Sequence, residues 1–299
     1  MKKIVLSALL FSIVGFAQTE ETIISGNSKL HFKTFGKGKP ILIINGGPGM
    51  NCEGFAFIAQ ELAKMNYQTI IYDQRGTGKS TLKKATSQTV TMDLMVKDIE
   101  NLRSHLKFKT WIVFGHSFGG IMAAYYASKH PEAIDKLIFS SSGGINMNFT
   151  TYASKRMFTN LTQTEKDSLD YYQAKIDKGD TSEETKILRA KYLAFAYVFN
   201  KKNAPVIAKR LTQTRLEINQ LVFGDLRKIE YDCAGKFKNF KKSVIVLEGK
   251  NDIITTDTAK EIADAFPNSK LVLIDNCGHY GWLDAPTIYF DSIKTFLNN

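Results

Sequence analysis

Short apolar runs alternate along this chain with longer segments of helical periodicity. Runs rich in β-branched and aromatic residues, bounded by Gly, Pro and Asn, are typical of strands. They occur at 22–25, 30–35, 41–44, 69–72, 111–114, 137–139, 244–247 and 271–274, and helical patterns occur at 55–65, 92–106, 119–129, 258–266 and 286–297. The first two runs predict an antiparallel pair. From residue 41 onward, the alternation of strand and helix predicts a mostly parallel sheet with helices on both faces.

The alternation stops between about residues 143 and 242, where the pattern is helical, as at 182–199 and 205–223. Such an insertion is expected to cover the carboxyl ends of the strands, where open α/β sheets bind their ligands. The predicted organisation is a core made of residues 18–142 and 243–299, interrupted by a helical cap at 143–242.

The first 17 residues have the pattern of a secretory signal peptide. Lys2 and Lys3 precede an apolar run from Ile4 to Ala17, which predicts cleavage near Ala17. A permanent membrane anchor is the alternative, but it needs about 20 apolar residues. We therefore expect an exported protein, periplasmic or secreted, without stable membrane insertion after cleavage.

The formal net charge of +11 is concentrated in the cap, where residues 151–242 contain 19 Lys and Arg against 11 Asp and Glu. These charges are scattered along polar helix faces and are not interleaved with aromatic residues, so the pattern excludes a nucleic-acid-binding stripe and favours a solvated basic face. Cys52, Cys233 and Cys277 are odd in number and widely spaced, which predicts neither a disulfide framework nor a metal site.

One serine lies where a strand pattern ends and a helix pattern begins, in the stretch VFGHSFGGIM. The motif Gly115-x-Ser117-x-Gly119 alone is weak, because it arises by chance in roughly one chain of this length in ten. Its strand-to-helix position is that of a nucleophile elbow. Such a turn exposes the Ser117 hydroxyl and places the Phe118 amide at a helix N-terminus, where it can stabilise negative charge.

A serine nucleophile needs a general base, and the base needs an orienting carboxylate. Of the five histidines, His31 lies on an early strand, His105 on a polar helix face, His130 at a helix end and His116 beside the serine itself. His279 follows the last strand, at the sheet edge where Ser117 is expected. It is the predicted base.

Asp252 is the predicted carboxylate, because it follows the strand at 244–247 at that same edge. Asp135 precedes its strand and so belongs to the opposite edge. Asp257 has the position of a helix N-terminal residue, and Asp275 ends its strand close before His279. These two remain alternatives to Asp252.

A glycine-rich loop, NGGPGM at 45–50, follows the strand at 41–44. Gly46 and Gly47 would let backbone amides approach a substrate oxygen without a side chain in the way. We predict that the Gly47 amide forms an oxyanion hole together with that of Phe118. A plain turn is the alternative interpretation.

Three segments, NGGPGM at 45–50, YDQRGTGKS at 72–80 and GHSFGG at 115–120, together with the order Ser117, Asp252, His279, give the chain a family resemblance. It resembles the α/β-hydrolase superfamily over essentially its whole mature length, and within it the proline iminopeptidase-like serine peptidases. The resemblance implies the α/β-hydrolase fold with an inserted helical cap. It also implies removal of an N-terminal residue, often proline, without a metal or organic cofactor.

Relatives in that family bind the protonated amino terminus through carboxylates of the cap. TRLEINQ at 214–220 is similar to the family's Arg-x-Glu segment, which would assign this task to Glu217; an exposed helical glutamate is the alternative. Two departures are Asn45, where the family has His, and the short basic cap. They leave an acidic peptide or an amine-free ester open as substrates. Asp73 and Arg75 are interpreted as a local ion pair.

The sequence thus predicts an exported serine aminopeptidase of the proline iminopeptidase type, acting on a small molecule or short peptide. A carboxylesterase or lactonase with the same three residues is the second hypothesis. A non-catalytic receptor is the third, and the presence of Ser117, Asp252 and His279 together argues against it. Oligomeric state stays open.

Overall fold

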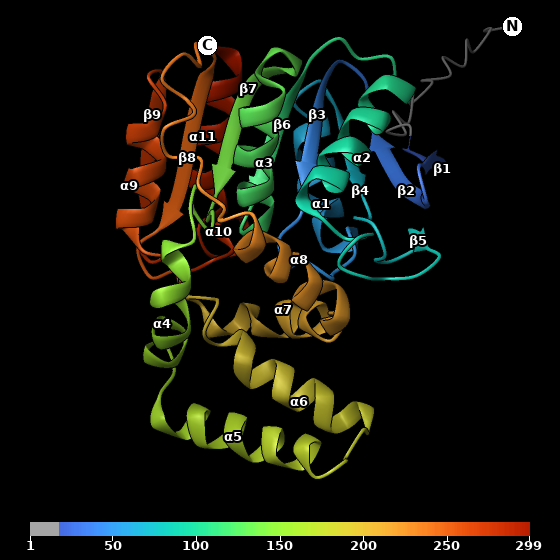
Figure 1. Ribbon diagram of the computed structural model, residues 1–299. Helices are drawn as coiled ribbons and strands as arrows, with labels where there is room; N and C mark the ends of the chain where they lie inside the picture. Colours follow the sequence, from blue (N-terminus) through green and yellow to red (C-terminus); the bar gives the residue numbers. More distant parts are fainter. Residues whose placement is uncertain (1–17) are drawn as a thin grey trace, which may run out of the picture.

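A single mixed β-sheet forms the centre of the protein, for which the computed structural model describes residues 18–299 (Figure 1). The predicted signal peptide therefore lies outside the described residues. The strands are β1 (Gln18–Ser25), β2 (Ser28–Phe35), β3 (Lys39–Ile44), β4 (Tyr67–Tyr72), β5 (Thr81–Leu82), β6 (Trp111–His116), β7 (Ile134–Ser140), β8 (Ser243–Gly249) and β9 (Ser269–Ile274). Their order is β1-β2-β4-β3-β6-β7-β8-β9, with β5 beside β2. The predicted antiparallel entry pair and the parallel sheet from β3 onward are confirmed.

Alternating side chains of the central strands fill two cores, one on each face of the sheet. In β3, Leu42 and Ile44 belong to one core, and Ile41 and Ile43 belong to the other. The first core is covered by α2 (Met92–His105), α3 (Phe118–Lys129) and α9 (Thr256–Ala265), and the second by α1 (Ala56–Ala63) and α11 (Pro286–Asn298). Because helices cover both faces of the sheet, the sequences of its central strands are continuous apolar runs.

Between β7 and β8 the chain forms α4 (Ala153–Thr159), α5 (Gln163–Asp177), α6 (Glu183–Ala194), α7 (Ala204–Leu211) and α8 (Leu216–Lys228). Figure 1 shows these helices gathered at one end of the sheet, the end to which the parallel strands point. Apolar residues of α6 and α7 join the core on one face, while Ile218, Val222 and Leu226 of α8 join the core on the other. The cap is thus anchored to both sides of the sheet.

The prediction of one helix over 205–223 is wrong, because the chain breaks between α7 and α8. At the break, the Arg215 amide donates to the Gly49 carbonyl at 2.9 Å. A Cβ on Gly49 would lie 2.5 Å from the Arg215 carbonyl oxygen, so this close approach requires glycine. A contact with the loop after β3 overrides the local helical pattern.

The interpretation of Asp73 and Arg75 as an ion pair with each other is also wrong. Arg75 pairs instead with Asp98 of α2, at 2.7 Å and fully buried. Asp73 accepts from the His31 ring and from the amide of Cys52, at 2.9 and 2.8 Å. The loop after β4 is therefore held by two separate buried networks, because each charge has a partner distant in sequence.

Cys52, Cys233 and Cys277 are buried free thiols. Within residues 18–299, the helices are too short or too polar for any of them to cross a membrane.

Candidate active site

Ser117 lies at the sharp turn between β6 and α3, at the carboxyl end of the sheet. Its backbone has φ 55° and ψ −120°, a conformation that costs a non-glycine residue about 1–3 kcal/mol. The turn brings backbone segments so close together that only glycine fits at two positions. A Cβ on Gly115 would lie 2.3 Å from the Gly119 carbonyl oxygen, and a Cβ on Gly119 would lie only 2.0 Å from the Ile44 carbonyl oxygen. Close backbone packing therefore requires the glycines around the serine.

The loop after β3 packs directly on this serine. A Cβ on Gly46 would lie 2.6 Å from the Ser117 Cβ. The Gly46 carbonyl accepts from Arg210 Nη2 at 2.8 Å and from Asn45 Nδ2 at 3.1 Å. In a trans peptide the next amide points the opposite way, so these two donors turn the Gly47 N–H away from themselves. Phe118 is the first residue of α3, where an N–H lacks an intrahelical partner.

His279 lies in the loop after β9, and its ring is oriented by Asp252 in the loop after β8. The Nδ1 atom lies 2.8 and 3.0 Å from the two Asp252 oxygens. Both residues are buried, and the His279 amide donates to the Tyr197 carbonyl of the cap at 2.8 Å. Because Nδ1 faces the carboxylate, Nε2 is left to face the cavity that His279 and Ser117 line together.

Asp252 is a buried carboxylate that stays ionised. Burial alone would raise its pKa, but the adjacent His279 ring and hydrogen bonds from His279 and the Ile254 amide lower the pKa below its usual value. Arg156 of the cap donates to the Asp252 carbonyl at 2.7 Å. The carboxylate is thereby fixed both in charge and in position.

Glu248, near the end of β8, is a second buried carboxyl beside this pair. Burial, followed by the charge of Asp252, raises the pKa of Glu248 well above its usual value. Neither of its oxygens has a hydrogen-bond partner among the described residues. A buried carboxylate without a donor or a positive partner is costly, so burial favours the neutral form. We therefore expect Glu248 to carry a proton beside the ionised Asp252.

We expect the variant Glu248→Gln to gain stability over the wild type as pH rises. In the unfolded chain Glu248 ionises above its usual pKa of 4.5, while in the folded protein it keeps its proton, so rising pH favours the unfolded wild type. Glutamine does not ionise and escapes this loss, which amounts to about 1.4 kcal/mol per pH unit between the two pKa values. Urea unfolding at several pH values measures the difference.

The matched control is Glu184→Gln on the exposed surface of α6, whose difference from wild type should not change with pH. If the Glu248→Gln difference were equally flat above about pH 4.5, Glu248 would be ionised in the folded protein.

Of the other four histidines, only His116 lines the smaller cavity beside Ser117 and His279. His116 is buried among Phe55, Trp282 and the His279 ring, and burial, with the nearby positive charges, lowers its pKa well below the usual value. His31 bonds to Asp73 and Glu20. His105 and His130 lie near surface glutamates.

The two alternatives to Asp252 lie in other surroundings. Asp257 is in the first turn of α9, and Asp275 pairs with Lys250.

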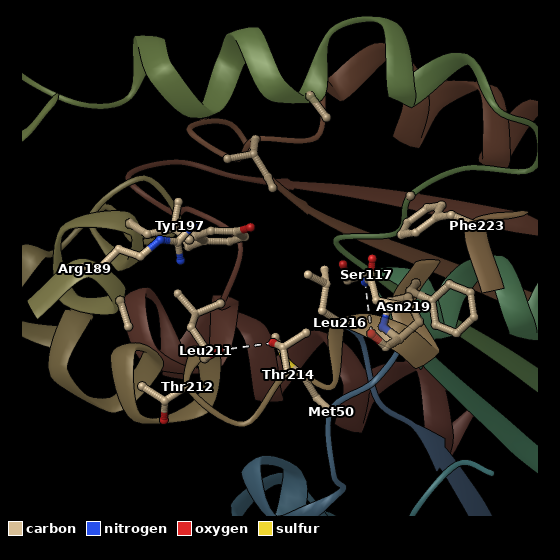
Figure 2. A pocket seen from close by; sticks show the side chains of 18 of the residues that line it. Met50, Ser117, Arg189, Tyr197, Leu211, Thr212, Thr214, Leu216, Asn219 and Phe223 are labelled. Atoms are coloured by element: carbon tan, nitrogen blue, oxygen red, sulfur yellow. Dashed lines mark hydrogen bonds between the residues drawn. The ribbon is translucent and has the colours of Figure 1, made fainter. Parts of the chain in front are cut away.

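A cavity of about 580 Å³ opens above Ser117, between the sheet and the cap (Figure 2). Gly47 and Phe118 line it together with Ser117, and Leu216, Asn219 and Phe223 of α8 line it from the cap. A smaller cavity alongside is lined by Gly47, Ser117 and His279. The structure thus brings together five of the predicted site residues, with Asp252 directly behind His279.

Glu217 is not brought into this group. Its neighbours Leu216 and Asn219 line the cavity, but the Glu217 side chain is 62% exposed and lies 3.9 Å from Arg215. Its assignment to the substrate's amino terminus stays a prediction.

Arg210 of α7 is a site residue that sequence reasoning missed. It is buried and stacks over the Phe55 ring at 4.7 Å. It donates a hydrogen bond to the Gly46 carbonyl, which lies 164 residues earlier in the sequence. In the sequence it is one of many basic residues of the cap, and nothing local distinguishes it.

Comparison with known proteins agrees with this fold. Residues 39–286 match the model of a family described as alpha/beta hydrolase fold. A proline iminopeptidase of Lactobacillus acidophilus is 26% identical over 284 residues, covering 90% of this chain and 94% of that protein.

Two solved structures illustrate the shared fold. The chain resembles a proline iminopeptidase from Mycobacterium smegmatis with a TM-score of 0.73 at 20% identity, covering 94% of this chain and 98% of that one. It resembles an esterase from Exiguobacterium antarcticum with a TM-score of 0.71 at 17% identity, covering 94% and 100%. Together with the family match over most of the chain, these findings show that the protein belongs to the hydrolases of the α/β-hydrolase fold family and is proline iminopeptidase-like.

Proposed function

We propose that the protein is a serine hydrolase in which Ser117 is the nucleophile, His279 the general base and Asp252 the residue that orients it. The observation that carries this proposal is the bonded pair of Asp252 and His279 beside a strained serine, with His279 and Ser117 lining one cavity. A buried ionised carboxylate on Nδ1 fixes the tautomer in which Nε2 can accept a proton.

In the proposed reaction, Ser117 Oγ attacks the substrate carbonyl carbon while its proton passes to His279 Nε2. The oxyanion is held by the amides of Gly47 and Phe118. The carbonyl then re-forms as the bond to the leaving group breaks, and His279 protonates the leaving amine. Water, deprotonated by His279, releases the acyl group and regenerates the serine.

We propose an aminopeptidase of the proline iminopeptidase type as the physiological activity. The support is the likeness to proline iminopeptidases over nearly the whole chain, together with a cavity sized for a small ligand or short peptide. We further propose that the protein is exported after cleavage near Ala17, which N-terminal sequencing of protein from fractionated cells would test.

Amine recognition by Glu217 is part of this proposal, and it requires the side chain to turn from Arg215 toward the cavity. We then expect Glu217→Gln to raise KM about tenfold for substrates with a free amino terminus and to spare esters, because a charge-assisted hydrogen bond is lost. Steady-state kinetics on a prolyl amide and an ester measure this. Equal effects on both substrates, or none on either, would exclude this role for Glu217.

A carboxylesterase or lactonase is the second candidate, and one observation favours it. Neither of the two cavities at Ser117 has a carboxylate in its lining, and a buried ammonium is costly without one. An ester without an amine would meet no such cost.

One panel separates the two candidates. Purified protein is offered Pro, Ala and other aminoacyl amides beside short-chain p-nitrophenyl esters. The aminopeptidase proposal predicts turnover of the prolyl amide with the highest kcat/KM. Turnover of the esters with no aminoacyl amide cleaved would overturn it in favour of an esterase.

A further inference from the structure

Arg189 gives the larger cavity a positive charge at the side facing away from Ser117. Its lining contains two cationic side chains, Lys186 and Arg189 of α6, and no Asp or Glu. Figure 2 shows Arg189 beside Tyr197 on one side of the cavity, across from Ser117. A ligand that spans the cavity from Ser117 therefore ends against α6.

Arg189 is the cation available to such a ligand. Arg189 is half-buried, and its guanidinium donates to Gln173 Oε1 through Nε. Within residues 18–299 no carboxylate lies within ion-pair distance of it. Lys186 is more exposed and is already paired with Glu183 at 3.0 Å. A guanidinium has five N–H donors in a planar fork that matches a carboxylate, so most of the hydrogen-bonding capacity of Arg189 is free.

Three other arginines of the cap differ from Arg189 in this respect. Arg156 donates to the Asp252 carbonyl, Arg210 to that of Gly46, and Arg215 to that of Gly76. Each of these ties the cap to the core. Among the described residues, Arg189 bonds only to a side chain of the neighbouring helix α5, so its charge is not needed to hold the cap on the core.

We propose that Arg189, supported by Lys186, binds a carboxylate at the far end of the substrate, and that the enzyme prefers very short peptides with a free C-terminus. This inference rests on the proposed function, since it takes the scissile carbonyl to lie at Ser117. A prolyl dipeptide or tripeptide has an ammonium next to the scissile carbonyl and a carboxylate at its other end. The charge of the cavity matches the second of these groups.

The test compares substrates that differ only in that carboxylate: Pro-Ala and Pro-Ala-Ala as free acids and as C-terminal amides. Wild type is expected to have a kcat/KM about 10- to 100-fold higher for the acids, the range for a charge-assisted hydrogen bond. Arg189→Gln should remove most of this preference through KM and leave the amides within about twofold. Arg189→Lys should keep part of it, because the charge remains while the fork is lost.

Arg227→Gln is the matched control, because Arg227 is an exposed arginine of α8 outside both cavities; it should leave the preference unchanged. The preference should also weaken with added salt, since charge attraction is screened. Equal kcat/KM for acids and amides in the wild type, or a parallel loss on both in Arg189→Gln, would overturn the proposal.

A second pair of substrates separates this inference from the proposed function. The hexanoyl esters of 4-hydroxybenzoic acid and of 4-hydroxybenzamide share one acyl group, and only the first has a carboxylate on its leaving group, as a prolyl peptide has. If no prolyl substrate is cleaved but the hydroxybenzoate ester is preferred through Arg189, the aminopeptidase proposal fails and the anion subsite stands. If prolyl substrates are cleaved without regard to the carboxylate, the subsite fails and the aminopeptidase stands.

Discussion

Ser117→Ala is expected to lower kcat by about 10⁴- to 10⁶-fold, the loss typical of removing the nucleophile from a serine hydrolase. The methyl group cannot form an acyl-enzyme, while the oxyanion amides and the cavity still bind the substrate, so KM should change little. Steady-state kinetics on whichever substrate of the panel turns over best will measure this. Thermal unfolding should move little, because the Ser117 side chain makes no hydrogen bond to another side chain in the described part of the chain.

Ser128→Ala is the matched control. Ser128 lies near the end of α3, the helix that begins directly after Ser117. Its hydroxyl donates to the Tyr125 carbonyl one turn earlier, and it lines neither cavity at Ser117. Its activity should stay within about twofold of the wild type, as for surface substitutions in general. Activity that survives Ser117→Ala would exclude Ser117 as the nucleophile.

Asp252→Asn is expected to lower kcat by about 10⁴-fold with the fold intact. The asparagine amide would donate to His279 Nδ1, which forces the ring proton onto Nε2. In that tautomer His279 cannot accept the proton of Ser117. Oδ1 of the asparagine can still accept from the Ile254 amide, so the loop after β8 should keep its shape.

Two acids that the sequence left as alternatives provide the comparison for Asp252. Asp257 is exposed in the first turn of α9, and Asp275 pairs at the surface with Lys250. Asp257→Asn and Asp275→Asn should each keep activity within about twofold of the wild type. A loss in either variant comparable to that in Asp252→Asn would reassign the orienting carboxylate.

The periodicity of the sequence was sufficient to predict the sheet, because its central strands are buried on both faces and appear as apolar runs between turn residues. It missed β5, which has only two residues paired with β2. It also merged α7 and α8, because their apolar pattern continues across the break and the cause of the break is Gly49, in a distant loop. Local pattern predicts elements, whereas contacts between distant segments decide where some of them end.

The positions of Ser117, Asp252 and His279 were predictable because chain order and sheet edge constrain them. The partners of Asp73 and Arg75 were not predictable from the sequence, since each of these side chains pairs with a residue on another element and not with the other. Glu248 and Arg189 were missed for a related reason. Their importance comes from what surrounds them, a buried carboxylate in one case and a cavity without acids in the other, and neither environment is visible in the sequence.

Covalent labelling decides whether Ser117 is the nucleophile. The wild-type protein is treated with a fluorophosphonate, which reacts with activated serines, and its peptides are analysed by mass spectrometry while residual activity is followed. We predict one adduct, on Ser117, that accumulates in proportion to lost activity, is absent in Ser117→Ala and forms far more slowly in Asp252→Asn. Loss of activity with the adduct on another residue, or full activity with Ser117 labelled, would contradict this prediction.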